Sequence, residues 1–253
     1  MKPGRIINNF LLVLVACLCV YVYLVLFPQV LFKEKVSYRN FNIYSNEHID
    51  NKIFEIIDNA IVELRKSELY DSTKKQKIFF IHDSFYNRLT GDYNRNQLGY
   101  HEFFINNTMI VPKVDVKENT LIGIDGRLHV LAATIVHETI HSFQENRYGF
   151  FKVLRTPEWK LEGYAFYIAR SSKVMNNGHL SVEYARQCLN DVSKYQTRKG
   201  YWLYGFMTGY LLTEKGITLD ELMNDSVKYQ ATLDELIKWY WQNRGMYQLF
   251  ASI

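Results

Sequence analysis

The pattern of hydrophobic positions divides the chain into two parts. From Phe10 to Phe32 the sequence runs for 23 residues without a charge, interrupted only by a proline and a glutamine. A helix rises about 1.5 Å per residue, so the part that precedes the proline would cover roughly 27 Å, close to the thickness of the bilayer hydrocarbon. The pattern predicts an N-terminal tail with a transmembrane helix over residues 1–35, followed by one domain over residues 36–253.

Two other interpretations of the apolar segment stay open. A cleaved signal peptide has a shorter apolar core that ends in small residues of the Ala-x-Ala kind, which this segment lacks. The sequence LVAC, ending at Cys17, resembles a bacterial lipobox, but further apolar residues follow it instead of a polar tether. We therefore expect an uncleaved, single-pass membrane anchor.

The orientation of this anchor is not determined by its flanking charges. The basic residues that flank it are nearly balanced: Lys2 and Arg5 precede it, and Lys33, Lys35 and Arg39 follow it. A short internal tail with an extracytoplasmic domain is the usual arrangement for such anchors, and it is the one we expect.

After residue 35 the pattern changes to short amphipathic segments. Apolar residues at helical spacing predict a first helix through Ile53, Ile56, Ile57, Ile61 and Leu64. The stretches KIFFIHD (77–83) and HEFFINNTMIVPKV (101–114) are rich in aromatic and β-branched residues, which predicts strands joined by a turn. From Asp125 onward nearly everything has a helical pattern. We expect an α+β fold in which a small sheet packs on the first helix of a mostly helical C-terminal half.

Composition and charge narrow the function classes. The chain is 48% hydrophobic and 22% charged, which fits one or two globular domains, and its net charge is only +4. The one basic cluster, Lys74 to Lys77, is more typical of a solvated turn, so we expect no nucleic-acid partner. Cys17 and Cys19 lie in the apolar segment and Cys188 is alone, which excludes a disulfide framework in the domain. The oligomeric state stays undetermined.

The sequence IVHETIHSFQ (135–144) carries the candidate chemistry. A helix is expected around it, with Asp125 as its cap, an apolar stripe that includes Leu128, and an end at Tyr148-Gly149. At about 100° per residue, His137 and His141 project from one helix face, where both imidazoles can reach a tetrahedral zinc ion. Glu138 points to the side where a water molecule on the ion would lie.

A zinc site needs a third ligand, and geometry sorts the candidates. Glu145 is eight residues from His137, roughly 12 Å along a helix, so we expect it to be solvated or structural. The segment TPEWKLEGYAFYIA (156–169) offers Glu158 and Glu162. Glu158 is explained by its place in the first turn after a Thr156 cap and Pro157.

Glu162 has no such explanation. It stands among apolar residues, where a carboxylate is costly to bury unless it meets a cation. Gly163 beside it indicates close approach to another helix, as two ligand-bearing helices around one metal would need. We therefore expect Glu162 to be the third ligand.

Together, His137-Glu138-x-x-His141 and the later Trp159-x-x-Glu162-Gly163-x-Ala165 resemble the gluzincins, the thermolysin-like and aminopeptidase-like metallopeptidases of the zincin superfamily. The resemblance covers about residues 127–170. It implies that His137, His141 and Glu162 bind one Zn²⁺ per chain and that Glu138 is the general base.

A second stretch, YWLYGFMTGYLLTEKG (201–216), is similar to the helix that follows the site in small domains of the peptidase MA type. That similarity implies that Tyr201 or Tyr204 donates a hydrogen bond to the oxyanion. A packing role in the core is the alternative for both tyrosines.

The sequence also departs from related families. Gln144 and Arg147 stand where a metzincin has its glycine and third histidine, which excludes that class. The Gly-x-Met-Glu-Asn motif of the aminopeptidases is absent, so exopeptidase activity is not supported. Phe166 and Tyr167 stand where a thermolysin-like enzyme has an aspartate that orients a histidine ligand, which leaves the orienting group unidentified.

These observations predict a membrane-anchored zinc endopeptidase that acts on a peptide or protein substrate. We expect the strand FFIN (103–106) or TMIVP (108–112) to align an extended peptide by edge pairing. The alternative is a non-catalytic, membrane-anchored binding or assembly module with a zincin fold.

Overall fold

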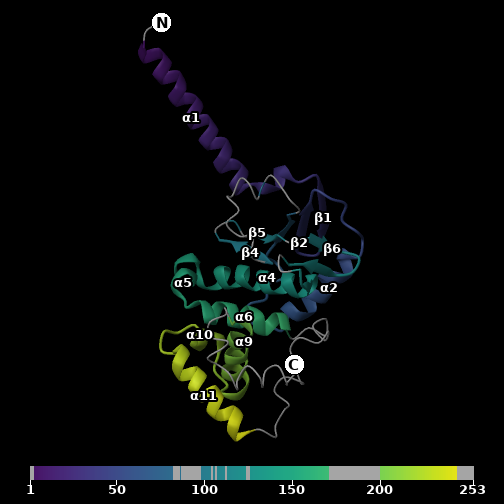
Figure 1. The fold of residues 1–253 in the computed structure, drawn as a ribbon, viewed down its shortest axis with the longest axis vertical. Coiled ribbons are helices and arrows are strands. Elements are labelled where there is room, and N and C mark those ends of the chain that lie inside the picture. Colours follow the sequence, from purple (N-terminus) through teal and green to yellow (C-terminus); the bar gives the residue numbers. More distant parts are fainter. Residues whose placement is uncertain are drawn as a thin grey trace.

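The chain passes from one long apolar helix into a five-stranded sheet and then into a group of helices (Figure 1). The computed structural model describes residues 3–81, 86, 98–103, 105, 107–111, 113–123, 126–170 and 200–243. Mixed helices and small sheets confirm the predicted α+β class.

Helix α1 (Pro3–Leu26) projects away from the rest of the chain. Its apolar side chains are open to the surroundings, with Phe10 69% and Leu12 68% exposed. Among the described residues, α1 alone is long and apolar enough to cross a membrane. Exposed apolar surface on this scale is unusual for a segment that faces only water.

The apolar segment continues beyond the end of the long helix. Helix α1 ends at Leu26, and a 3₁₀ turn, η1 (Pro28–Leu31), follows it. Pro28 is buried, and the ring of Phe32 packs on that of Phe79 with centroids 5.1 Å apart. Leu31 and Phe32 therefore pack beside buried residues of the larger sheet.

The larger sheet has the order β1-β2-β3-β5-β4. Its strands are β1 (Glu34–Tyr38), β2 (Phe41–Ser45), β3 (Gln76–Phe80), β4 (Gly99–Glu102) and β5 (Asn107–Ile110). The central pairs β2/β3 and β3/β5 are parallel, whereas the outer strands β1 and β4 run antiparallel to their neighbours. The parallel β2/β3 pair needs a crossover, which α2 (Ile53–Leu64) supplies.

The structure confirms part of the predicted sheet and corrects its edge. The predicted amphipathic helix is α2, and its five predicted apolar residues are all buried. The predicted strands correspond to β3 and to the β4/β5 pair. The expected edge strand was wrong: β5 pairs on both sides, and β4 ends the order of the sheet. Residues 104 and 106 of the FFIN stretch lie outside the described residues.

A smaller sheet precedes the motif helix and changes its predicted start. It consists of β6 (Lys113–Asp115), β7 (Thr120–Ile122) and β8 (Leu128–Val130). Leu128 is therefore in a strand, 67% exposed, and the expectation that it belongs to the helix stripe was wrong. Asp125, the predicted cap, lies outside the described residues. Asn119 instead accepts from the backbone N–H of Leu131 with its carbonyl and from that of Ala132 with its side chain, each at 3.0 Å.

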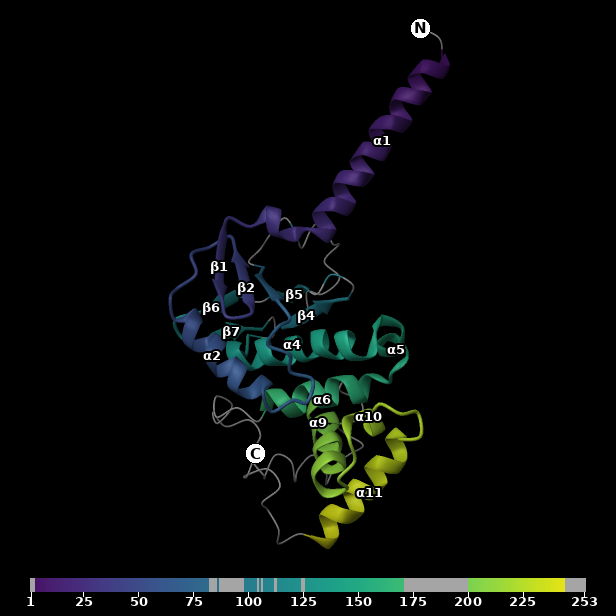
Figure 2. The ribbon, with the colours of Figure 1, turned by 180° about the vertical axis from the view of Figure 1, so that it is seen from behind.

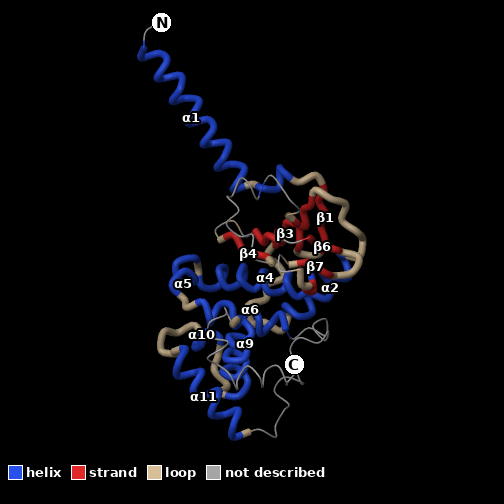
Figure 3. Tube along the Cα trace, in the orientation of Figure 1, coloured by secondary structure: helices blue, strands red, loops and turns tan. Residues whose placement is uncertain are grey.

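Helix α4 (Leu131–Tyr148) carries the motif and lies between two layers (Figure 2). It ends at Gly149 with φ of 77°, which confirms the predicted C-terminus. The larger sheet covers one side of α4, and α6 (Glu158–Arg170) covers another (Figure 3). Ile135, Val136, Ile140 and Phe143 are all buried, so this helix has apolar contacts on several sides rather than one stripe.

Of the remaining helices, the first continues from the end of α4, and the others lie beyond α6 on the side away from the sheet. They are α5 (Phe150–Arg155), α9 (Tyr201–Gly209), the π-helical turn η3 (Tyr210–Glu214), α10 (Leu219–Leu222) and α11 (Tyr229–Gln242). A Cβ atom at Gly163 would lie 2.5 Å from Thr208 Oγ1 and 2.6 Å from the carbonyl oxygen of Tyr204. The predicted close approach at Gly163 is confirmed, but the neighbouring helix is α9 and not the ligand-bearing α4.

Candidate metal centre

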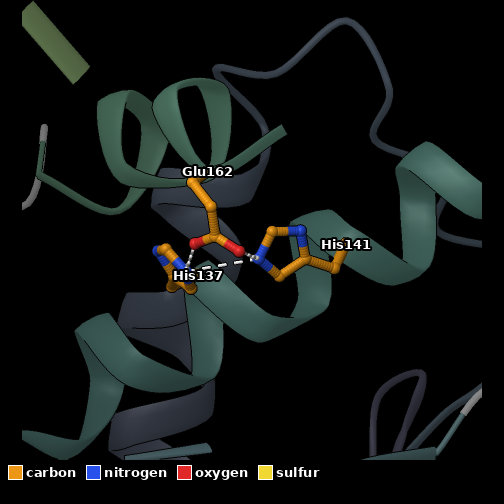
Figure 4. Close-up of side chains that lie close together, drawn as sticks. All are labelled: His137, His141 and Glu162. Atoms are coloured by element: carbon orange, nitrogen blue, oxygen red, sulfur yellow. Dashed lines mark hydrogen bonds and ion pairs between the residues drawn. The ribbon is translucent and has the colours of Figure 1, made fainter. Parts of the chain in front are cut away.

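Three side chains from α4 and α6 converge on one point (Figure 4). His137 Nε2 lies 3.1 Å from Glu162 Oε2, and His141 Nε2 lies 3.5 Å from Glu162 Oε1. The two Nε2 atoms are 3.3 Å apart. The structure thus brings together the three residues that the sequence predicted as ligands.

These distances fit a tetrahedral zinc site. Zinc bonds to histidine nitrogen and carboxylate oxygen are about 2.0–2.2 Å, so neighbouring donors on a tetrahedron lie roughly 3.3–3.6 Å apart. The two Nε2 atoms are 3.3 Å apart, and each lies 3.1 or 3.5 Å from a different oxygen of Glu162, which is close to that range. Two imidazoles and a carboxylate are also the donor set of zinc sites that keep one position for water or substrate.

Glu158, the rejected candidate, lies elsewhere. It is exposed in the first turn of α6, one turn before Glu162, which agrees with its predicted place at the helix N-terminus. The Thr156 hydroxyl donates to the carbonyl of Lys152 at 2.8 Å at the end of α5, and its predicted role as the cap of α6 stays a prediction.

The charges of the three residues are strongly coupled. Burial alone would raise the pKa of Glu162, but the two imidazoles outweigh burial and lower that pKa well below its ordinary value. Burial alone would lower the pKa of His141, but the facing carboxylate of Glu162 raises it to about 9. Protons and a metal ion compete for the same lone pairs, so zinc affinity should fall as pH drops below about 9.

Glu138 is buried, with 7% of its surface exposed. Burial raises the pKa of its carboxyl group, His137 and His141 oppose that rise, and Glu162 adds to it. A carboxyl group with a raised pKa holds a proton more readily than an ordinary carboxylate does, which favours a role as general base.

Gln144 orients one of the histidines, a role that the sequence analysis did not assign. The Nδ1–H of His141 donates to Gln144 Oε1 at 2.9 Å, and Gln144 Nε2 donates to the carbonyl of Leu161 at 3.0 Å. The second bond fixes which end of the amide faces the ring, so His141 Nε2 is left with a lone pair for a metal. Gln144 is completely buried and connects both ligand-bearing helices. Its helical spacing of three from His141 was the available signal.

Phe166, which stands where an orienting aspartate was sought, packs in another direction. Its ring contacts α9 at Gly205, where a Cβ atom would lie 2.5 Å from Phe166 Cδ1. The orienting group therefore comes from α4 itself rather than from α6.

A second histidine-carboxylate pair joins β4 to α4. The Nε2–H of His101 donates to Glu145 Oε2 at 2.9 Å, and the His101 side chain is 1% exposed. Burial lowers the pKa of His101, although Glu145 opposes this effect. Glu145 is thus structural, in agreement with its predicted exclusion as a ligand. Nothing in the sequence connects His101 to Glu145, because they are 44 residues apart.

Of the two tyrosines predicted as donors to the oxyanion, the structure describes the side chain of Tyr204 alone. Tyr204 lies on α9, and burial raises its pKa, with smaller contributions from Glu158 and Glu162. Its ring centroid is 6.1 Å from that of Tyr229, so it also has the packing role given as its alternative. The side chain of Tyr201 lies outside the described part of the chain, and its predicted role stays a prediction.

Comparison with known proteins gives no family assignment: no protein-family model matches the chain, and no curated protein matches its sequence. The functional interpretation therefore depends on the geometry of the site and on the resemblance of its motifs.

The assignment of Glu162 as third ligand can be tested against Glu158. Glu162→Ala should lose most zinc affinity, because two histidines alone leave an incomplete set of ligands. Glu158→Ala, the matched control one turn away, should keep its zinc and lose only about 0.3–1 kcal/mol of unfolding free energy. Metal analysis of the purified variants measures the first effect, and denaturant titration measures the second. A loaded Glu162→Ala protein beside an empty Glu158→Ala protein would contradict the assignment.

The role of Gln144 predicts a loss of affinity without loss of a ligand. Gln144→Leu should weaken zinc binding by about 10–100-fold, because His141 loses the acceptor that orients its ring. Thr139→Val is a suitable control, since Thr139 is also buried on α4 and its hydroxyl has no hydrogen-bond partner among the described residues. Competition with a chromophoric chelator measures both affinities. Equal affinities in the two variants would show that Gln144 does not orient His141.

Proposed function

We propose that the chain is a membrane-anchored zinc endopeptidase of the gluzincin type. The observation that carries this proposal is the convergence of His137, His141 and Glu162, which each offer one ligand atom within 4.8 Å of the others. The order of the motifs along the chain supports it, because the third ligand follows the histidine pair on the next long helix.

Each residue has a distinct role in the proposed reaction. His137, His141 and Glu162 would hold one Zn²⁺, and the bound ion would supply Lewis-acid chemistry that polarises the scissile carbonyl and lowers the pKa of a water molecule. Glu138 takes a proton from that water and later passes it to the leaving amine. The raised pKa of the Glu138 carboxyl supports this proton transfer.

Strand β4 is the proposed binding edge for the substrate. It ends the order of the sheet, and its inner side lies on the motif helix. An extended peptide that pairs with β4 would therefore run beside α4, which carries the general base. Tyr204 is a candidate donor to the oxyanion, because its backbone lies against Gly163, the residue next to the proposed third ligand.

We propose that α1 is the membrane anchor, because of its length and its exposed apolar surface. Its exposed apolar surface covers the length needed to cross a bilayer, and the folded domain begins directly after it. With a short tail on the inner side, the domain would lie outside the cytoplasm.

The decisive variant for catalysis is Glu138→Gln. It should keep a full complement of zinc and lower kcat by at least about 10²-fold, because the amide cannot accept the proton. Glu158→Gln makes the same chemical change at an exposed position and should retain activity. Turnover of an unstructured protein and zinc content should be measured on the same preparations. Full zinc binding in the native protein without any turnover would favour the non-catalytic binding or assembly module.

The anchor predicts stable membrane association. The native chain should remain in the membrane fraction after a carbonate wash, because removing a buried apolar helix from lipid is unfavourable. A form that lacks residues 1–26 should be released by the same wash. N-terminal sequencing completes the measurement. A native chain that begins near residue 30 and is recovered without membranes would instead indicate a cleaved signal peptide.

A further inference from the structure

Strand β4 presents alternate residues to opposite sides of the sheet, and its inner residues face α4. Glu102 lies on the outer side, where its carboxylate accepts a hydrogen bond from the Tyr86 hydroxyl at 2.6 Å. His101 lies on the inner side and bonds to Glu145. Gly99 shares the inner side with His101, because residues two apart on a strand point the same way.

Gly99 lies against the candidate general base. A Cβ atom at this position would be 2.9 Å from Glu138 Cγ and 3.0 Å from Glu138 Oε1. It would also be 3.0 Å from the carbonyl oxygen of Met109 on β5. Real Cβ atoms are rarely this close to a neighbour, so any side chain here would require Glu138 to move.

Backbone conformation does not account for the glycine. The described glycines with positive φ are Gly126, Gly149 and Gly216, and Gly99 is not among them. An alanine could therefore adopt the backbone angles of residue 99 without strain. Close packing against the Glu138 carboxylate is the reason that the structure gives for glycine at this position.

We propose that Gly99 is a positioning residue for Glu138. The backbone of β4 forms one wall of the space that the carboxylate occupies, and this wall limits the side-chain conformations open to Glu138. The hydrogen bond between His101 and Glu145 holds the same strand on the same helix, two turns further along α4. The contact between Gly99 and Glu138 is a feature of the structure, and its role in catalysis rests on the proposed function.

The first test is Gly99→Ala in the full-length protein. The added methyl group should displace the carboxylate and lower kcat by about 10–100-fold, since small misplacements of a reacting group are costly. KM and zinc content should stay close to those of the native protein, because the atoms nearest to a Cβ at residue 99 belong to Glu138 and Met109 and not to a proposed zinc ligand. Gly209→Ala is the control: its Cβ would meet only the Tyr167 ring, at 3.3 Å. Unchanged kcat in a folded, zinc-loaded Gly99→Ala protein would overturn the proposal.

The second test needs no catalytic activity. Thermal stability is measured for Gly99→Ala, for Glu138→Ala and for the double variant. Glu138→Ala removes Cγ and Oε1, so the penalty of Gly99→Ala should be smaller in that background, whereas the contact with Met109 is common to both and cancels. If the single Gly99→Ala variant does not fold, the double variant should recover folded protein. Strictly additive effects would overturn the proposal.

The two tests separate this inference from the proposed function. A native protein that hydrolyses no peptide would contradict the function, and the stability cycle would still decide whether Gly99 controls the position of Glu138. A Gly99→Ala variant with strong coupling in stability and reduced kcat supports both.

Discussion

A carboxylate enclosed with two imidazoles is the constraint on which the rest of this structure depends. Glu162 lies on one helix and His137 and His141 lie on another, so their contact fixes the distance between α6 and α4. Glu162 is partly buried, and a charge in such a place is costly unless it is paired. Contacts of 3.1 and 3.5 Å to the two imidazoles tolerate little relative movement of the two helices. The surrounding layers provide that rigidity.

The residues and elements that surround α4 and α6 each restrict the movement of these two helices in a different way. Gln144 bonds to His141 and to the carbonyl of Leu161, so it connects the helices beside the ligands. On the far side of α6, Gly163 brings α9 close enough for its backbone to contact α6 directly. On the near side, β4 rests on α4 through Gly99 and through the bond of His101 to Glu145. The site thus has fixed elements on several sides, as a preorganised reaction centre requires.

The sequence predicts those features that depend on spacing within one element. The burial of α2, the shared face of His137 and His141, and the preference for Glu162 over Glu158 all follow from helical periodicity and from the cost of burying a charge. Contacts between distant segments were not predicted. The Asn119 cap and the pairing of His101 with Glu145 depend on how strands pack on α4, which no local pattern encodes. The start of α4 was misjudged for the same reason, because Leu128 fits a helix stripe but pairs in a strand.

The junction between α1 and the sheet determines how far the domain can travel. A flexible glycine- or serine-rich linker would let a tethered domain sample a wide volume above the membrane. Here the chain between Leu26 and Glu34 forms a 3₁₀ turn with a buried proline, and the ring of Phe32 packs on Phe79. This segment is therefore not a flexible linker. With α1 in a bilayer, the site would stand at a nearly constant height above the lipid surface. The junction would then fix the distance between the site and the membrane. The distance of a substrate's peptide bond from the membrane would matter as much as the residues around that bond.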